Sequence, residues 1–191
     1  MFQNHAAYLE LIIGPMFSGK TSKLVQIYKQ CKICNIPVVA INHISDNERN
    51  PDQGTYLTNH DNIPIPCVST NDLSVLTNIL GTYQVILVNE GQFFHDLVPF
   101  VKSQLSQKKQ IYIAGLDGDF QRNVFGDLLQ LIPLCDKVEK LASLCGICKN
   151  GNPGIFSKRI STEMTQMVVG GSDKYIPVCR ICYETDIEEN V

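Results

Sequence analysis

Four short apolar segments, each followed by polar or Gly-rich residues, predict the strands of a sheet. They cover residues 8–13, 37–41, 84–88 and 110–114. At 37–41 and 84–88 apolar and polar positions do not alternate, which is typical of parallel strands covered on both faces. The pattern therefore predicts a mostly parallel sheet whose ligands bind at the carboxyl ends of the strands.

Helical patterns or loop compositions separate these strands. Helices are predicted from Ser22 to about Cys34, from Asn71 to Leu80, after Asp96, and from Phe125 to Leu131. Gly81 and Pro133 are expected to end two of them, and Asp96 is expected to cap the third, whose apolar face holds Leu97, Phe100, Val101 and Leu105. Residues 45–59 are rich in Asp, Asn, Pro and Gly, which predicts a loop. The expected fold is α/β, with helices on both faces of the sheet.

The alternation of strands and helices stops at about residue 142. Short segments, cysteine pairs and the sequence Gly-Asn-Pro-Gly at 151–154 follow it. We therefore predict two domains, an α/β nucleotide-binding domain at 1–142 and a small zinc-binding domain at 143–191.

The turn after the first strand matches the phosphate-loop pattern G-x-x-x-x-G-K-[ST] at every fixed position. Its residues are Gly14, Pro15, Met16, Phe17, Ser18, Gly19, Lys20 and Thr21. In such a loop, backbone N–H groups and the lysine bind the phosphates of a nucleoside triphosphate, and the Thr21 hydroxyl can hold Mg²⁺. The alternative is an ordinary Gly-rich turn. The strand before the motif and the helix after it favour the phosphate site.

The overall composition is that of a globular protein, since 44% of the 191 residues are hydrophobic. There are 16 Lys and Arg against 19 Asp and Glu, a net charge of −3, so no chain-wide basic field favours nucleic acid or anionic lipid. No apolar run approaches the roughly 18 residues of a membrane helix, and the N-terminus carries no secretion signal. We therefore expect a soluble cytoplasmic protein that binds neither membranes nor nucleic acid.

Four of the eight cysteines have the spacing of a zinc site. Cys145 and Cys148 form one Cys-x-x-Cys hairpin and Cys179 and Cys182 a second, which together supply four thiolates for tetrahedral Zn²⁺. With no open ligand position, the zinc would be structural. The remaining cysteines, Cys31, Cys34, Cys67 and Cys135, are interpreted as packing residues.

Polar residues follow the apolar strand 84–88. Phosphate-loop enzymes usually place an Asp here to hold Mg²⁺, but this chain has Asn89, so another acid such as Asp61 is needed or the metal is held more weakly. Glu90 is the candidate general base, because a carboxylate beside the γ-phosphate can accept the proton of an attacking hydroxyl. The alternative is a solvated glutamate at a strand end.

Several motifs in this order resemble the cytosolic-type (type II) thymidine kinases. Besides the phosphate loop and the four zinc-spaced cysteines, they are Glu90–Phe94, Leu116–Arg122 and Gly170–Tyr175, and the resemblance runs from Leu11 to Tyr183. It implies a RecA-like α/β domain, a zinc-held lasso loop, and transfer of the γ-phosphoryl group of ATP to the 5′-hydroxyl of thymidine. It also implies a homotetramer and a role in nucleotide salvage.

The resemblance assigns roles by motif. Glu90 matches the proton acceptor, while Asp61, Asn89 and Gln92 are grouped with the phosphate loop around ATP and Mg²⁺. The substrate positions are Met16, Phe93, Leu116, Phe120, Gln166, Met167, Val168, Val169, Gly170 and Tyr175. A flat neutral pyrimidine suits aromatic stacking and backbone hydrogen bonds. For Phe94 we expect core packing instead.

Two other functions are consistent with parts of the sequence. One is a phosphate-loop ATPase whose zinc ribbon binds nucleic acid, although its basic clusters are few and lack interleaved aromatic residues. The other is a catalytically impaired nucleotide-binding relative, suggested by Asn89.

Overall fold

A computed structural model describes residues 6–46, 56–58, 63–168 and 170–185. Its centre is a six-stranded sheet in the order β5-β2-β6-β7-β1-β8, with every neighbouring pair parallel. The strands are β1 (Tyr8–Ile13), β2 (Val38–His43), β5 (Val68–Thr70), β6 (Val85–Val88), β7 (Gln110–Gly115) and β8 (Lys137–Lys140). The four predicted strands and the parallel α/β fold are therefore confirmed.

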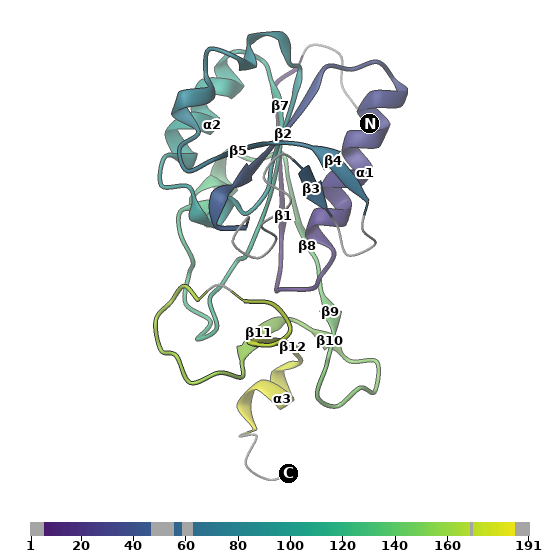
Figure 1. Ribbon diagram of the computed structural model, residues 1–191, viewed down its shortest axis with the longest axis vertical. Helices are drawn as coiled ribbons and strands as arrows, with labels where there is room; N and C mark the ends of the chain where they lie inside the picture. The colour runs from purple at the N-terminus through teal and green to yellow at the C-terminus, as the bar shows by residue number, and fades with distance from the viewer. Residues whose placement is uncertain (1–5, 47–55, 59–62, 169, 186–191) are drawn as a thin grey trace.

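Helices cover both faces of this sheet, as predicted (Figure 1). On one face, α1 (Lys20–Ile33) buries Leu24, Val25 and Ile27 against the strands. On the other, α2 (Leu97–Ser106) buries Leu97, Phe100 and Val101, and the 3-10 helix η6 (Leu128–Leu134) adds Leu128 and Leu131. Phe94 is 1% exposed within this second cluster, which confirms its core role.

The helix predicted at 71–80 is wrong. Two 3-10 turns stand there, η3 (Ser74–Leu76) and η4 (Leu80–Thr82). The Ser74 N–H donates to the Asp96 carboxylate, and the Thr77 hydroxyl donates back to the Ser74 carbonyl. These bonds compete with helical ones, while the apolar pattern is still satisfied because Leu73, Leu76 and Leu80 are buried.

The predicted helix ends near 96 and 131 also need correction. Asp96 precedes α2, but its side chain makes no cap hydrogen bond: Oδ2 accepts from the Ser74 N–H, and Oδ1 is buried without a partner among the described residues. The segment predicted as a helix at 125–131 forms η6, which continues through Pro133 to Leu134. Gly126, in the left-handed region at φ 61°, interrupts the backbone before the 3-10 turns begin.

Part of the predicted loop 45–59 is regular. After the 3-10 turn η1 (Ile44–Asp46), strand β3 (Tyr56–Thr58) pairs antiparallel with β4 (Pro64–Pro66). Leu57 and Ile65 are buried against the α1 side of the core, which accounts for this strand pair in a polar segment. Residues 47–55 and 59–62 lie outside the described residues.

Beyond β8 the chain forms a smaller part below the sheet (Figure 1). It contains two antiparallel pairs, β9 (Ser143–Leu144) with β10 (Pro153–Gly154), and β11 (Phe156–Arg159) with β12 (Tyr175–Val178), followed by α3 (Arg180–Glu184). The segment between β11 and β12, residues 160–174, is here called the lasso segment. The change of architecture falls between β8 and β9, near the predicted boundary at 142.

The cysteines outside the predicted zinc set behave differently from one another. Cys31 is fully buried in α1, and Cys67 and Cys135 pack half-buried against the core, as expected. Cys34 is exposed, so its packing interpretation is wrong, because α1 ends at Ile33 and the chain turns there at the surface.

Across the described residues, no helix combines the length and apolarity required to cross a membrane.

Candidate active site

The phosphate loop connects the end of β1 to the start of α1. Gly14 has φ 144°, and a Cβ there would lie 2.4 Å from the Leu141 carbonyl oxygen, so only glycine fits. Phe17 and Gly19 also have positive φ, which turns successive backbone groups into a compact loop. Lys20 Nζ donates to the Pro15 carbonyl at 2.6 Å, so its charge lies over the loop.

The electrostatics of this loop suit an anion. Helix α1 begins at Lys20, has no acidic residue in its first turn, and no side chain caps its N-terminus. Free N–H groups and the helix dipole at such an end favour negative charge. The predicted phosphate residues are thus assembled where a triphosphate can bind.

A chain of amide side chains leads away from Thr21. The Thr21 hydroxyl donates to Asn89 Oδ1 at 3.4 Å, Asn89 Nδ2 donates to Asn42 Oδ1 at 2.9 Å, and Asn42 Nδ2 donates to Asp46 Oδ2 at 3.0 Å. Asp46 is therefore the acid that the described structure links to Asn89, whereas Asp61 lies outside the described residues. Sequence reasoning missed Asn42 and Asp46, although their position at the carboxyl end of β2 was a usable signal.

Glu90 adopts an unusual backbone conformation at the end of β6. Its φ of 56° and ψ of 42° lie in the left-handed region, which is sparsely populated for non-glycine residues and is often found at functional sites. The chain then enters the 3-10 turn η5 (Gly91–Phe93), and Gln92 Nε2 donates to Glu90 Oε2 at 2.6 Å. Gln92 Oε1 in turn accepts from the Leu116 N–H at 2.9 Å.

Gln92 therefore joins the candidate base to the loop after β7. It is 3% exposed, and a Cβ at Gly126 would lie 2.0 Å from its carbonyl oxygen, so the surrounding backbone fixes its place. The structure places Gln92 beside Glu90, and its expected role in binding the cofactor stays a prediction.

His43 is a further neighbour that sequence reasoning missed. It lies at the end of β2, is 8% exposed, and its ring packs edge-on against Phe94 with centroids 4.8 Å apart. Burial lowers the pKa of His43, and the charge of Glu90 opposes this only in part. The imidazole is therefore neutral at pH 7 and brings no positive charge to Glu90.

A pocket lies between the phosphate loop and the lasso segment. Its lining includes eight of the predicted substrate positions: Met16, Phe93, Leu116, Phe120, Gln166, Met167, Val168 and Tyr175. Gly170 is not among the lining residues, and Val169 lies outside the described residues. Gly118, Asp119, Phe125 and Ser157 also line the pocket and were not predicted.

Long-range hydrogen bonds hold the walls of this pocket together. The Met16 N–H of the phosphate loop donates to Ser157 Oγ on β11 at 2.9 Å. Gln166 Nε2 of the lasso segment donates to Asp119 Oδ2 at 2.9 Å. The pocket is thus built from four parts of the chain: the phosphate loop, Phe93 after β6, residues 116–125 after β7, and residues 157–175.

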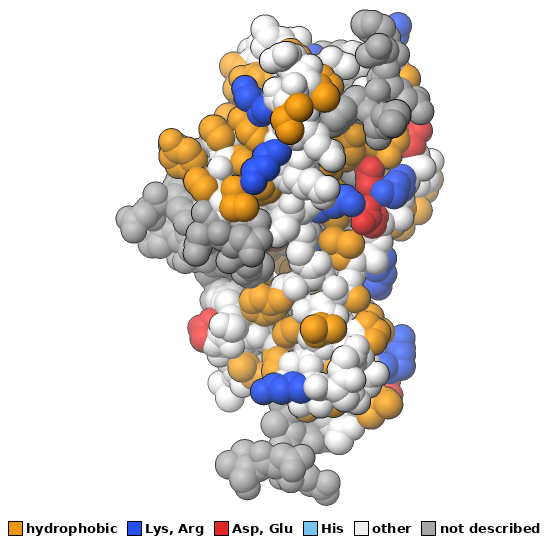
Figure 2. Space-filling model, turned by 90° about the vertical axis from the view of Figure 1, so that its right-hand side faces the viewer, with side chains coloured by type: hydrophobic (Ala, Val, Ile, Leu, Met, Phe, Trp, Pro, Cys, Tyr) orange, Lys and Arg blue, Asp and Glu red, His pale blue; other side chains and the backbone are white. Residues whose placement is uncertain are grey.

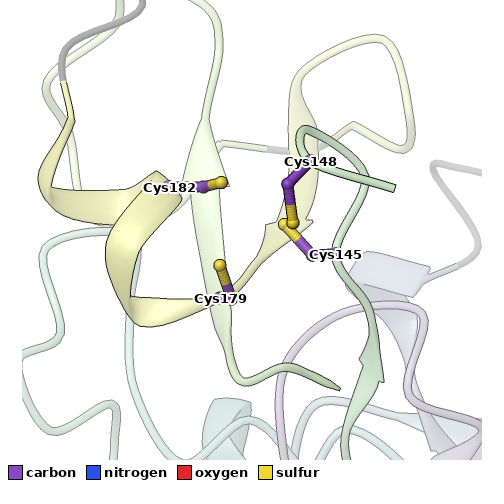
Figure 3. A group of neighbouring side chains, drawn as sticks. All are labelled: Cys145, Cys148, Cys179 and Cys182. Atoms are coloured by element: carbon purple, nitrogen blue, oxygen red, sulfur yellow. The ribbon is translucent and has the colours of Figure 1, made fainter. Parts of the chain in front are cut away.

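The four predicted metal ligands meet in one cluster (Figure 3). Cys145 and Cys148 come from the turn after β9, whereas Cys179 immediately precedes α3 and Cys182 lies within it, so the second pair is not a hairpin as predicted. All four Sγ atoms lie within 4.8 Å of one another, and Zn–S bonds of about 2.3 Å require separations of about 3.8 Å. The donor set and its size fit a tetrahedral zinc ion.

Comparison with known proteins gives a consistent result. A family profile described as "Thymidine kinase" matches residues 7–183. The chain is 39% identical to the thymidine kinase of Sheeppox virus (strain KS-1) over 176 residues, which cover 92% of this chain and 96% of the relative. It is 37% identical to the thymidine kinase of Yaba monkey tumor virus (strain VR587), with 94% and 96% covered, and 38% identical to that of Choristoneura fumiferana entomopoxvirus, with 92% and 95% covered. The profile spans the phosphate loop, the pocket and the cysteine cluster.

Proposed function

The chain belongs to the thymidine kinase family, and we propose that it transfers the γ-phosphoryl group of ATP to the 5′-hydroxyl of thymidine. One observation carries the finer part of this proposal. Met16 is both a residue of the phosphate loop and a wall of the pocket, so a donor bound at the loop and an acceptor in the pocket would be neighbours. Such placement of two reactants is a large part of phosphoryl-transfer catalysis.

The pocket walls suit a pyrimidine nucleoside. Phe93, Phe120 and Tyr175 offer aromatic surface, and Met16 and Leu116 add apolar surface. A neutral planar base binds favourably between such groups, while backbone atoms of the lasso segment can supply directional hydrogen bonds. Among the described pocket residues, Asp119 is the charged one, and three hydrogen bonds already engage its carboxylate.

Glu90 is the proposed general base. In this role it accepts the proton of the 5′-hydroxyl as the new O–P bond forms and the bond from the γ-phosphorus to the β,γ-bridging oxygen breaks, leaving ADP. Gln92 joins the Glu90 carboxylate to the backbone of Leu116, which lines the pocket, whereas Glu90 itself is not among the lining residues. Burial keeps the neighbouring His43 neutral, so this side chain does not form an ion pair with the Glu90 carboxylate.

Metal ions complete the proposal. Thr21 and Asn89 would hold Mg²⁺, which neutralises charge on the transferring phosphates when bound. The cysteine cluster would hold a structural zinc ion that pins the two ends of the segment carrying the lasso. On this view residues 143–191 form a zinc-binding domain attached to the α/β domain 1–142.

The test is an assay of purified protein with ATP, Mg²⁺ and thymidine. We expect ADP release that depends on thymidine and yields the 5′-monophosphate. Release stimulated only by DNA or RNA would instead indicate a nucleic-acid-dependent ATPase. Tight thymidine and ATP binding without release would indicate an impaired relative.

The face of the molecule drawn in Figure 2 favours the nucleoside over a nucleic acid. On the face drawn in Figure 2, Lys and Arg side chains are spread among hydrophobic and neutral ones and do not form one basic patch. Nucleic-acid sites usually concentrate basic residues along a groove. From the family resemblance we also propose that the protein is a homotetramer. It would act in the cytoplasm, in the salvage of DNA precursors.

Replacing Asn89 with Asp should lower the Mg²⁺ concentration needed for half-maximal activity by about three- to ten-fold, because an added carboxylate strengthens metal binding. The same change places the Asn42 amide between two acids, the new carboxylate and Asp46, so some stability should be lost. The measurement is Mg²⁺ titration of both ATP binding and turnover. Asn78→Asp, an exposed site in the loop before β6, is the control. Equal Mg²⁺ requirements in all three proteins would mean that Asn89 is not near the metal.

A further inference from the structure

Arg159 is a buried cation in the described structure without a described acid as partner. It ends strand β11, is 8% exposed, and forms no ion pair among the described residues. Its Nε has no hydrogen-bond partner there. A buried guanidinium needs compensation from somewhere, so the groups that surround it indicate what it is for.

The Arg159 guanidinium donates hydrogen bonds to backbone carbonyls of the lasso segment. Nη1 donates to the carbonyl oxygens of Glu163 at 2.8 Å and Thr165 at 2.6 Å, and Nη2 donates to that of Gln166 at 3.0 Å. These bonds converge on one side chain from a stretch that has no regular secondary structure. In a helix or a sheet, backbone N–H groups would bind these carbonyls. Here Arg159 binds them instead, and so fixes the path of this backbone.

The same guanidinium contacts two aromatic walls of the pocket. Its Cζ lies 3.7 Å from the centroid of the Phe120 ring, a close cation–π contact. Nη2 also donates to the Tyr175 hydroxyl at 2.7 Å, and that hydroxyl donates to the Val168 carbonyl at 3.0 Å. Phe120 lines the pocket and Arg159 does not, so the guanidinium contacts this ring without being part of the pocket lining itself.

We propose that Arg159 is a positioning residue that assembles the nucleoside side of the pocket, by holding the Phe120 ring and the carbonyls of residues 163–168 in one arrangement. The inference rests on the proposed function and adds a determinant of nucleoside binding to it. Because the compensating carbonyls belong to the lasso segment, opening this segment would remove the hydrogen bonds that compensate the cation. The closed arrangement is therefore favoured before a nucleoside arrives, which lowers the ordering cost of binding.

Arg159→Lys is the main test variant. Lysine keeps the charge but lacks the planar fork that engages three carbonyls and stacks on a ring. We expect the Kd for thymidine, measured by calorimetry without ATP, and the KM for thymidine to rise about ten-fold, and the KM for ATP to stay within about two-fold. Hydrogen exchange in residues 160–168 should become faster, with zinc content unchanged.

Lys158→Met is the matched control. Lys158 is the preceding residue of β11 and also donates to three carbonyls, those of Cys182, Tyr183 and Thr185, but these lie in and after α3 and none of them lines the pocket. This variant can lose stability yet should keep the KM for thymidine within about two-fold. If Arg159→Lys does not fold, Tyr175→Phe serves instead, because it keeps the ring and removes the hydroxyl between Arg159 and Val168; we expect about a three-fold rise in the Kd for thymidine.

The outcomes separate the two levels of the proposal. If the unmodified protein neither binds nor phosphorylates thymidine, the proposed function fails. If it does both, but Arg159→Lys and Tyr175→Phe bind thymidine as tightly as the unmodified protein, the positioning role is wrong. Equal losses of thymidine and ATP affinity would also overturn it, because they would indicate general destabilisation.

Discussion

Replacing Glu90 with Gln should lower turnover by about 10²-fold or more while ATP still binds, because the variant loses the proton acceptor but keeps the shape of the side chain. The amide can still accept the hydrogen bond from Gln92, so the local structure around the strained residue is expected to persist. The measurement is kcat from thymidine-dependent ADP release, with calorimetric affinity for ATP and thymidine determined on the same protein.

Glu184→Gln is a suitable control for this change. Glu184 is an exposed glutamate of α3 that pairs with Arg122 at 3.3 Å, and it lies outside the pocket lining. Its turnover should match that of the unmodified protein. If Glu90→Gln retains normal turnover, the general base is another group, and a joint loss of ATP binding would point to a structural role for Glu90.

Replacing Cys145 with Ser should abolish stoichiometric zinc binding and, with it, thymidine-dependent activity. Structural zinc contributes on the order of 10 kcal/mol to small zinc peptides, far more than the short strands of this region can replace. We expect the zinc content to fall from about one ion per chain to near zero. The midpoint of thermal unfolding should fall by at least about 10 °C.

Metal analysis, thermal unfolding and the activity assay check this together. Cys34→Ser is the matched control, because Cys34 is exposed and belongs to a Cys-x-x-Cys pair outside the cluster. It should retain zinc, stability and activity. Unchanged zinc content in Cys145→Ser would remove the cluster as the metal site.

Local patterns were sufficient for much of the fold. Segments such as Val85–Val88 are continuously apolar because both faces of the parallel sheet are covered, and that is visible in sequence. Strand β8, with the sequence Lys-Val-Glu-Lys, was not predicted, because it is a largely exposed edge strand that pairs only with β1 among the described strands. The region 71–80 has helical apolar spacing, but a hydrogen bond to Asp96, 22 residues from Ser74, changes its structure.

The candidate site also contains residues that local motifs predict and residues that depend on long-range contacts. Motif spacing predicts the phosphate loop, Glu90 and the zinc-spaced cysteines, since the residues of each motif lie close together in sequence. Arg159 and Asp46 have ordinary local contexts, and their interest arises only from contacts across the fold. No periodicity or spacing rule predicts that an arginine will bind carbonyls of a particular loop.

The hydrogen bond from the Met16 N–H to Ser157 Oγ has a consequence for protein engineering. It joins residues 141 positions apart and sets the register between the loop proposed to hold the donor and the segment proposed to hold the acceptor. A chimaera that takes residues 143–185 from a relative must therefore bring a side chain at position 157 that accepts this bond. Without one, both halves can fold correctly and still present their substrates out of alignment.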